Sequence, residues 1–191
     1  MGAVAAFIGT AALAVVLTRA PANNDVSLSS EVSGRVCSTS GLEAWLGAAG
    51  AADVPGVARS ARETSYALEF TNVSSRACSL YGYPEVSAYR DSAVAGGPIG
   101  GAAIRDTSVR PRPVMLEPGA TAHAVLRVTA ATRPAGCAEV TAEELRIRLP
   151  RQDRPSFVPV NIPVCSQRGH VSLSVQAIQA RPGVPGRVVT P

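Results

Sequence analysis

The chain has 191 residues, a net charge of +4 and a hydrophobic content of 46%, which excludes wholesale disorder and leaves room for one ordinary domain. Aromatic residues make up only 4%, so the core must be built mainly from Val, Leu, Ile and Ala. The basic residues are all arginines, spread without an aromatic-interleaved run. This charge fits a solvated surface or attraction to anionic polymers and lipid headgroups, and it argues against nucleic-acid binding.

The first 19 residues contain an apolar run, Gly2 to Leu17, that carries no charge. Its length lies between the apolar region of a signal peptide and a full membrane span. A cleaved signal, an uncleaved N-terminal anchor and a buried core helix are the three interpretations. The first two predict that the chain is exported, either extracellular or anchored to the outer face of the cytoplasmic membrane through this segment alone. Residues 20–35, which are polar and short-chained, predict a flexible linker.

The domain is expected to span residues 36–179, and a helix is predicted near its start. Ser40 and Glu43 match the capping box of a helix N-terminus, and apolar residues follow at helical spacing. Trp45 is expected to be a core plug against a sheet. The apolar positions of this predicted helix are Leu42, Trp45, Leu46 and Ala49.

From residue 62 onward, apolar and polar residues alternate, which is the period of β-strands. Residues 85–90 predict a further short strand, and the proline-interrupted segment 109–115 is at most an edge strand. Many short strands and one helix predict an all-β fold, an antiparallel β-sandwich. The expected inward residues are Tyr66, Leu68 and Phe70; Ala122, Ala124, Leu126 and Val128; Leu145, Ile147 and Leu149; Val158, Val160, Ile162 and Val164; and Val171, Leu173, Val175 and Ala177.

Turn-forming residues separate the predicted strands. Pro118 and Gly119 occupy the positions that a type II turn prefers. Asn72 opens a match to a glycosylation acceptor, but its place at the end of a strand favours a role in a turn. Residues 180–191 predict a disordered tail.

Four cysteines lie far apart in the sequence: Cys37, Cys78, Cys137 and Cys165. An even number of cysteines in an exported domain is typical of a disulfide framework. The chain lacks close pairs such as C-x-x-C, which metal sites use, so we expect two disulfides and neither a metal nor another cofactor. The spacing allows three pairings and does not choose among them.

Several motifs follow one another in a fixed order: Cys37, Asn72, Cys78, Gly82-Tyr83-Pro84, Leu116-x-Pro118-Gly119, Cys137 and Cys165. In order and spacing they resemble the actinobacterial family catalogued as domain of unknown function 4232, over about residues 36–178. The resemblance implies an immunoglobulin-like sandwich on a secreted protein or lipoprotein, although this chain lacks the N-terminal cysteine of the lipoprotein members. It also implies pairing of Cys37 with Cys78 and of Cys137 with Cys165, and it implies no activity.

No group of residues in the sequence predicts catalysis. Alternation places His123 on the outward face of its strand and His170 at a strand start, and neither has a serine or cysteine nucleophile in context. Glu143 and Glu144 are adjacent on a strand and therefore point to opposite faces. The common hydrolase and metalloprotease motifs are absent from the sequence. We therefore predict no catalytic residue and a protein that is not an enzyme.

Two sets of side chains are candidates for binding. Tyr81 and Tyr83 could form an aromatic rim for a glycan or peptide, although the Gly-Tyr-Pro context also fits a structural turn. The sequence favours a non-catalytic, exported cell-envelope module whose partner is a cell-wall polymer or an envelope protein. The alternatives are an envelope hydrolase with an unrecognised site and a passive spacer. The arginines that could contact anions are Arg105, Arg110 and Arg112, and separately Arg146, Arg148, Arg151 and Arg154.

Overall fold

The computed structural model describes residue 2 and residues 34–47, 63–91, 96–129 and 137–183. The chain divides into two units, residues 1–32 and 33–191, and the second contains the whole described domain. Almost all of the predicted signal or anchor, and most of the predicted linker, lie outside the described residues. Within the described part of the chain, no helix has the length and apolar character needed to cross a membrane.

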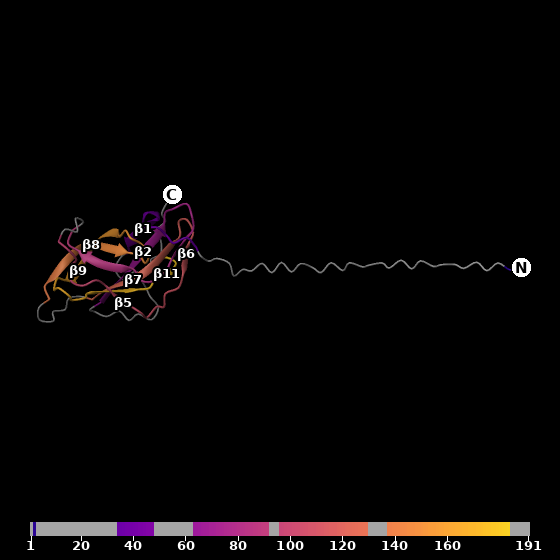
Figure 1. Ribbon diagram of the computed structural model, residues 1–191. Coiled ribbons are helices and arrows are strands. Elements are labelled where there is room, and N and C mark those ends of the chain that lie inside the picture. Colours follow the sequence, from indigo (N-terminus) through magenta and orange to yellow (C-terminus); the bar gives the residue numbers. More distant parts are fainter. Residues whose placement is uncertain (1, 3–33, 48–62, 92–95, 130–136, 184–191) are drawn as a thin grey trace. The chain divides into compact units, whose positions relative to one another are not determined.

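In the described residues the chain forms eleven β-strands and one 3-10 turn, η1, at Thr39–Gly41. The all-β class predicted from the alternation is confirmed (Figure 1). The strands are β1 Leu42–Leu46, β2 Glu63–Asn72, β3 Cys78–Leu80, β4 Glu85–Tyr89, β5 Ile104–Asp106, β6 Val114–Leu116, β7 Thr121–Thr129, β8 Glu139–Arg148, β9 Ser156–Cys165, β10 Leu173–Gln176 and β11 Gln179–Ala180.

The strands form three sheets that pack as a sandwich. The largest has the order β1-β2-β7-β10-β5, with β11 also paired to β7, and the others are β4-β8-β9 and β3-β6. In the described strands every pair is antiparallel except β5 with β10, which is parallel. The expectation of a purely antiparallel sandwich is therefore wrong at this edge. The chain crosses between sheets after β4, and such crossovers allow parallel pairing.

One apolar core lies between the layers, and it contains the predicted inward residues of β2, β7, β8 and β9 except Tyr66 and Val160, which are partly buried and pack against it. Phe70, Leu126 and Ile147 have no solvent exposure, and burial of such side chains stabilises a fold by roughly 1.5–3 kcal/mol each. The prediction fails at Val171, which is 36% exposed. The reason is that β10 starts only at Leu173, so Val171 lies in the connection before the strand.

The helix predicted near residue 42 is wrong. Those residues form β1, which pairs with β2 from Leu42 opposite Asn72 to Leu46 opposite Leu68. Apolar residues at 42, 44 and 46 fit a strand period. Pairing buries the first and packs the other two, partly buried, against the core, so tertiary packing overrides the local capping pattern. Trp45 then faces outward and is only partly buried, and its indole nitrogen lies 3.4 Å from the Thr71 hydroxyl. It is not a core plug.

The outer face of the large sheet is also partly covered. Glu69 of β2 and Val125 of β7 alternate with core residues, yet both are 0% exposed. Part of the predicted C-terminal tail contributes to this cover. Ala180 pairs with β7, and the amide of Gly183 donates to the Glu69 carboxylate at 2.8 Å. Residues 180–183 therefore belong to the fold, and the remainder of the predicted tail lies outside the described residues.

Two disulfides join Cys37 to Cys78 and Cys137 to Cys165, so the pairing implied by the family resemblance is confirmed. The bonded cysteines are 41 and 28 residues apart in the sequence. By restricting the unfolded chain, each is expected to contribute about 4 kcal/mol. Disulfides of this kind are typical of an oxidising compartment outside the cytoplasm.

Candidate functional site

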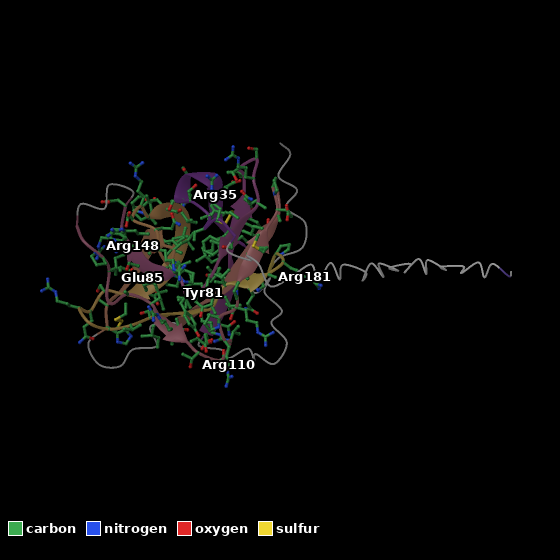
Figure 2. The ribbon with its side chains drawn as sticks, turned by 45° about the vertical axis from the view of Figure 1, so that its right-hand side comes forward. Arg35, Tyr81, Glu85, Arg110, Arg148 and Arg181 are labelled. Atoms are coloured by element: carbon green, nitrogen blue, oxygen red, sulfur yellow. A yellow bond between two sulfur atoms is a disulfide. The ribbon has the colours of Figure 1, made fainter. Side chains whose placement is uncertain are left out.

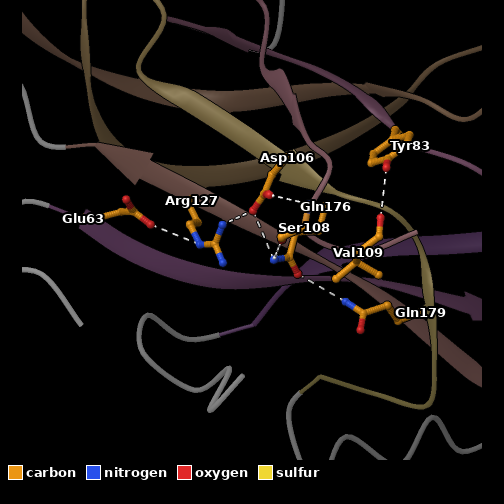
Figure 3. Close-up of polar contacts among 8 residues, drawn as sticks. All are labelled: Glu63, Tyr83, Asp106, Ser108, Val109, Arg127, Gln176 and Gln179. Carbon is orange, nitrogen blue, oxygen red and sulfur yellow. Dashed lines mark hydrogen bonds and ion pairs between the residues drawn. The ribbon is translucent and has the colours of Figure 1, made fainter. Parts of the chain in front are cut away.

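A polar network lies on the outer face of the large sheet, where β7, β10 and β5 are neighbours (Figure 3). Arg127 of β7 forms ion pairs with Asp106 of β5 and with Glu63 of β2, the latter at 3.1 Å between Nε and Oε1. The intervening strand presents Ser174 opposite Arg127, and this short side chain leaves room for the guanidinium to reach across. Alternation along β7 predicts that Arg127 faces outward, but nothing in the sequence identifies its partners.

Asp106 is the centre of this network. The backbone amide of Ser108 donates to its Oδ1 at 2.9 Å, and Nε2 of Gln176 donates to its Oδ2 at 3.1 Å. Burial by itself would raise the pKa of the carboxyl group. Hydrogen bonds from Ser108 and Gln176, together with the charge of Arg127, outweigh burial and lower the pKa to about 2. Asp106 is therefore a fixed anion that holds structure together and is not suited to proton transfer near neutral pH.

Gln176 connects this network to the last strand. Its side chain is among the largest that are fully buried. Its Nε2 donates to the Ser108 hydroxyl at 3.0 Å, and its Oε1 accepts a hydrogen bond from Gln179 at 3.3 Å. The loop after β5 is therefore attached to β10 and β11 by partly buried hydrogen bonds.

Beside the network is a surface hollow of about 630 Å³, within the range of about 300–1,000 Å³ that ligand sites occupy. Its apolar lining includes Val109, Val114 and Ile178. Arg110 and Arg112 also line it, and both are exposed. Neither guanidinium makes an ion pair with any described residue. We call this site the Arg110–Arg112 hollow, and Figure 2 shows Arg110 at the lower margin of the domain.

The two candidate rim tyrosines take different places in the structure. Tyr83 donates its hydroxyl hydrogen to the carbonyl of Val109 at 2.9 Å, and the guanidinium carbon of Arg105 lies 5.7 Å from the centre of its ring. It therefore supports the lining of the Arg110–Arg112 hollow from behind. Tyr81 is 50% exposed and is not among the residues that line this hollow. Gly82 separates the two with a φ of 100°, a conformation that favours glycine.

In the second group of predicted arginines, two members have side-chain contacts within the described structure. Arg148 lies 3.8 Å from the Glu85 carboxylate, with both side chains largely exposed. A guanidinium nitrogen of Arg146 lies 3.4 Å from the hydroxyl of Tyr89. These contacts occupy donors that an anion would need, whereas Arg110 has none within the described structure. The hollow is thus the better candidate for anion binding.

The structure does not bring the two histidines together. His123 faces outward as predicted, directly opposite Glu69 on β2, and its Nδ1 lies 2.8 Å from the carbonyl oxygen of Arg181. Because a carbonyl only accepts, this nitrogen carries the proton. His170 lies in a turn beyond Thr129, at the other end of β7. At about 3.3 Å per strand residue, the two side chains are on the order of 20 Å apart.

No metal centre is identified in the described part of the chain, where no three His, Cys, Asp or Glu side chains are grouped to hold an ion. Asn72, the predicted glycosylation acceptor, is 0% exposed. Its Nδ2 donates to the carbonyls of Arg76 and Leu116 at 2.9 Å each, and its Oδ1 accepts from the amide and hydroxyl of Ser74. Both amide hydrogens are committed, so this side chain organises a turn.

The fold and the site together define a disulfide-locked β-sandwich domain with an arginine-lined surface hollow. The family described as Domain of unknown function (DUF4232) matches residues 37–181 of the chain. This span runs from the first cysteine to just beyond β11, so the chain belongs to that family and the resemblance carried by its cysteine and turn motifs is confirmed. No curated protein and no solved structure matches the chain.

Proposed function

We propose that the chain is a non-catalytic, exported cell-envelope module that binds an extended acidic segment of an envelope protein in the Arg110–Arg112 hollow. The observation that carries this proposal is the combination, in one hollow, of an apolar floor with two exposed guanidinium groups that have no ion-pair partner among the described residues. Ligand sites commonly combine an apolar lining with a few polar groups that fix orientation. Arginine pairs well with carboxylates because its planar fork can donate two parallel hydrogen bonds.

The strands around the hollow favour an extended peptide as the ligand. Among the described strands, β6 pairs only with β3, and β11 pairs only with β7. Each therefore has one edge without a strand partner, and Val114 of β6 and Gln179 of β11 both line the hollow. An extended peptide can add main-chain hydrogen bonds to such an edge while its side chains enter neighbouring pockets.

The hollow is also held rigid before a ligand arrives. The Tyr83 hydroxyl fixes the Val109 carbonyl, and Gln176 fixes Ser108. Both contacts restrain the loop that carries Arg110. A site that is already ordered loses less conformational entropy on binding, which supports a binding role for this loop.

Export and the finer fold assignment are part of the same proposal. The apolar, uncharged run at residues 2–17 and the two disulfides support export from the cytoplasm. The two packed layers of short strands support an immunoglobulin-like sandwich. Mass spectrometry of the chain recovered from an envelope fraction tests export. We expect either a mature N-terminus after residue 17 or an intact one in the membrane fraction, with all four thiols oxidised.

The binding proposal is tested with a defined probe, a fluorescent extended peptide of alternating Val and Glu. We expect saturable binding to the full chain, and binding at least roughly tenfold weaker to the R110Q/R112Q double variant, because each lost charge-assisted pair is worth about 1.5 kcal/mol or more. The matched control is R154Q/R168Q, which removes two exposed arginines elsewhere. Equal affinity for both double variants, or binding to purified cell-wall polymer but not to the peptide, would overturn the proposal.

An envelope hydrolase is the second candidate, and the position of His123 directly opposite Glu69 favours it. A carboxylate beside an imidazole is a common acid–base arrangement. Esterase, glycosidase and peptidase substrates should be tested against the full chain and the H123Q variant. Turnover by the wild type that disappears in H123Q would put the hydrolase first. A passive spacer, the third candidate, would show neither binding nor turnover.

A further inference from the structure

A second hollow, of about 590 Å³, lies beside the disulfide at the start of the domain. Arg35, Arg76, Ser38 and Ser75 are among the residues that line it. We propose that this site, which we call the Arg35–Arg76 hollow, binds a phosphate group. It is separate from the Arg110–Arg112 hollow, because the two have no described lining residue in common. In Figure 2 Arg35 lies towards the top of the domain and Arg110 at its lower margin.

The chemistry of the lining favours phosphate. Arg35 and Arg76 are both exposed, and neither guanidinium has an ion pair or hydrogen bond with a described residue. None of the described residues that line this hollow is acidic. Two guanidinium groups and neighbouring serine hydroxyls supply the many donors that the oxygens of a phosphate require. The Arg110–Arg112 hollow has a more apolar lining and is less suited to such a ligand.

The disulfide brings the two arginines to the same place. Arg35 stands two residues before Cys37, and Arg76 stands two residues before Cys78. The bonded cysteines are 41 residues apart in the sequence, but their Cα atoms are 4.8 Å apart. Ser79 reinforces the junction, since its amide donates to the Arg35 carbonyl at 2.8 Å. The disulfide and this backbone pairing together bring into one place two arginines that are far apart in the sequence.

The turn that carries Arg76 is fixed as well. The carbonyl of Arg76 accepts a hydrogen bond from Asn72 at 2.9 Å, and the Ser74 hydroxyl bonds to Asn72 at 2.7 Å. Because Asn72 is buried, this turn is anchored in the fold. Both sides of the hollow are thus ordered before any anion binds, which reduces the entropy lost on binding.

The test uses the full chain labelled with ¹⁵N and titrated with inorganic phosphate at low ionic strength. We expect saturable shifts in the amide signals of Ser38, Ser75 and Cys78, with affinity reduced roughly tenfold in R35Q and in R76Q. R168Q, an exposed arginine remote from the hollow in sequence, is the control and should bind like the wild type. Equal affinity in all three variants, or no saturable shift at these amides, overturns the proposal.

A second pair of variants tests the role of the disulfide. C37S/C78S should bind phosphate more weakly, whereas C137S/C165S, which removes the other bridge, should retain wild-type affinity. If C37S/C78S does not fold, the arginine variants decide. If C37S/C78S and C137S/C165S both fold and bind phosphate with equal affinity, the inference that the Cys37–Cys78 disulfide assembles the site is wrong.

The source of the phosphate is separated by two further probes. Polyglycerol phosphate represents a soluble polymer, and vesicles containing phosphatidylglycerol represent a lipid headgroup. Binding to either probe that is lost in R35Q and R76Q but kept in R168Q supports the site and identifies its source. Binding to both probes that survives in R35Q and R76Q reflects general surface charge and counts against the site.

Discussion

Glu69 of β2 and His123 of β7 lie directly opposite each other, and each bonds to the segment that follows β11. The ring of His123 donates to the carbonyl of Arg181, and the carboxylate of Glu69 accepts from the amide of Gly183, both at 2.8 Å. Glu69 is fully buried although it faces away from the core. The segment is therefore attached to the sheet by hydrogen bonds at two neighbouring residues.

Removing the Glu69 carboxylate should loosen this attachment. Glu69→Ala leaves the Gly183 amide without its acceptor and opens a space under the segment, so we expect the free energy of unfolding to fall by about 1–3 kcal/mol. Urea denaturation measures the change. Glu117→Ala, which truncates an exposed carboxylate in a turn, should change it by less than about 0.5 kcal/mol. Equal stabilities of the two variants would contradict a structural role for Glu69.

Asp106 should make stability depend on pH in acid. Its folded pKa of about 2 lies below the ordinary value of 3.8, so its stabilising effect is complete above the ordinary pKa and is lost as the pH falls towards about 2. Asp106→Asn should be less stable than the wild type at pH 7 by about 1 kcal/mol, a value that allows for solvent screening. The difference should close between about pH 4 and pH 2.

Urea titrations at several pH values measure this profile. Asp153→Asn changes an exposed aspartate that has no partner within the described structure, and its profile should run parallel to that of the wild type. If the difference in unfolding free energy between the wild type and Asp106→Asn stays constant across the acid range, the pH dependence does not come from Asp106.

Asn72 should be intolerant of a nearly isosteric change. Asn72→Asp replaces the amide that donates to two backbone carbonyls with an oxygen that repels them. We expect a loss of about 2–4 kcal/mol in unfolding free energy. Asn161→Asp makes the same chemical change on an exposed part of β9 and should be nearly neutral. Similar urea midpoints for the two variants would show that the four hydrogen bonds of Asn72 matter little.

The free edge of β9 carries a proline, Pro163, that removes a hydrogen-bond donor, and a second proline, Pro159, lies in the same strand. The amide of Ser166 bonds to the carbonyl that precedes β8, whereas the amide of Cys165 bonds to a side chain elsewhere. Amide groups alternate in direction along a strand, so residue 163 shares the outward direction of Cys165, whereas residue 159 lies beyond a register shift in the pairing of β9 with β8. Both are prolines, which have no N–H and therefore blunt an edge against pairing.

Restoring these donors should create a dimer. The P159V/P163V variant should self-associate through β9 at micromolar concentration. Asn161→Val raises β-propensity but adds no backbone N–H donor, so it should remain monomeric. Light scattering coupled to size-exclusion chromatography measures the mass. If the double variant is as monomeric as the wild type, the prolines are not what protects this edge.

The sequence predicts the core layers well because alternation along long strands depends only on the pattern of side chains. The inward residues of β7 and β8 follow it. It fails at β1, where apolar residues fit both a helix and a strand, and where only pairing with distant β2 decides between them. It also misses β5, which has three residues and is largely exposed, too short a segment to show a period.

The candidate sites are less predictable because they join residues that are far apart in the chain. Arg110 and Arg112 are visible as a basic group, but the hollow also needs Gln179 of β11 and Ile178 directly before it. The ion pair of Arg127 with Asp106 likewise spans two strands that are not adjacent in the sheet. No local motif encodes either relationship.

The order of strands in the large sheet has a consequence for synthesis of the chain. Gln176 of β10 and Asp106 of β5 are 70 residues apart, and β10 lies between β7 and β5. A ribosome releases C-terminal segments last, so in a nascent chain the position of β10 between β7 and β5 is still empty. The missing strand is then an interior strand of the sheet and not an edge strand. A chain shortened before β10 therefore lacks an interior strand, and this layer closes only after nearly the whole domain has been translated.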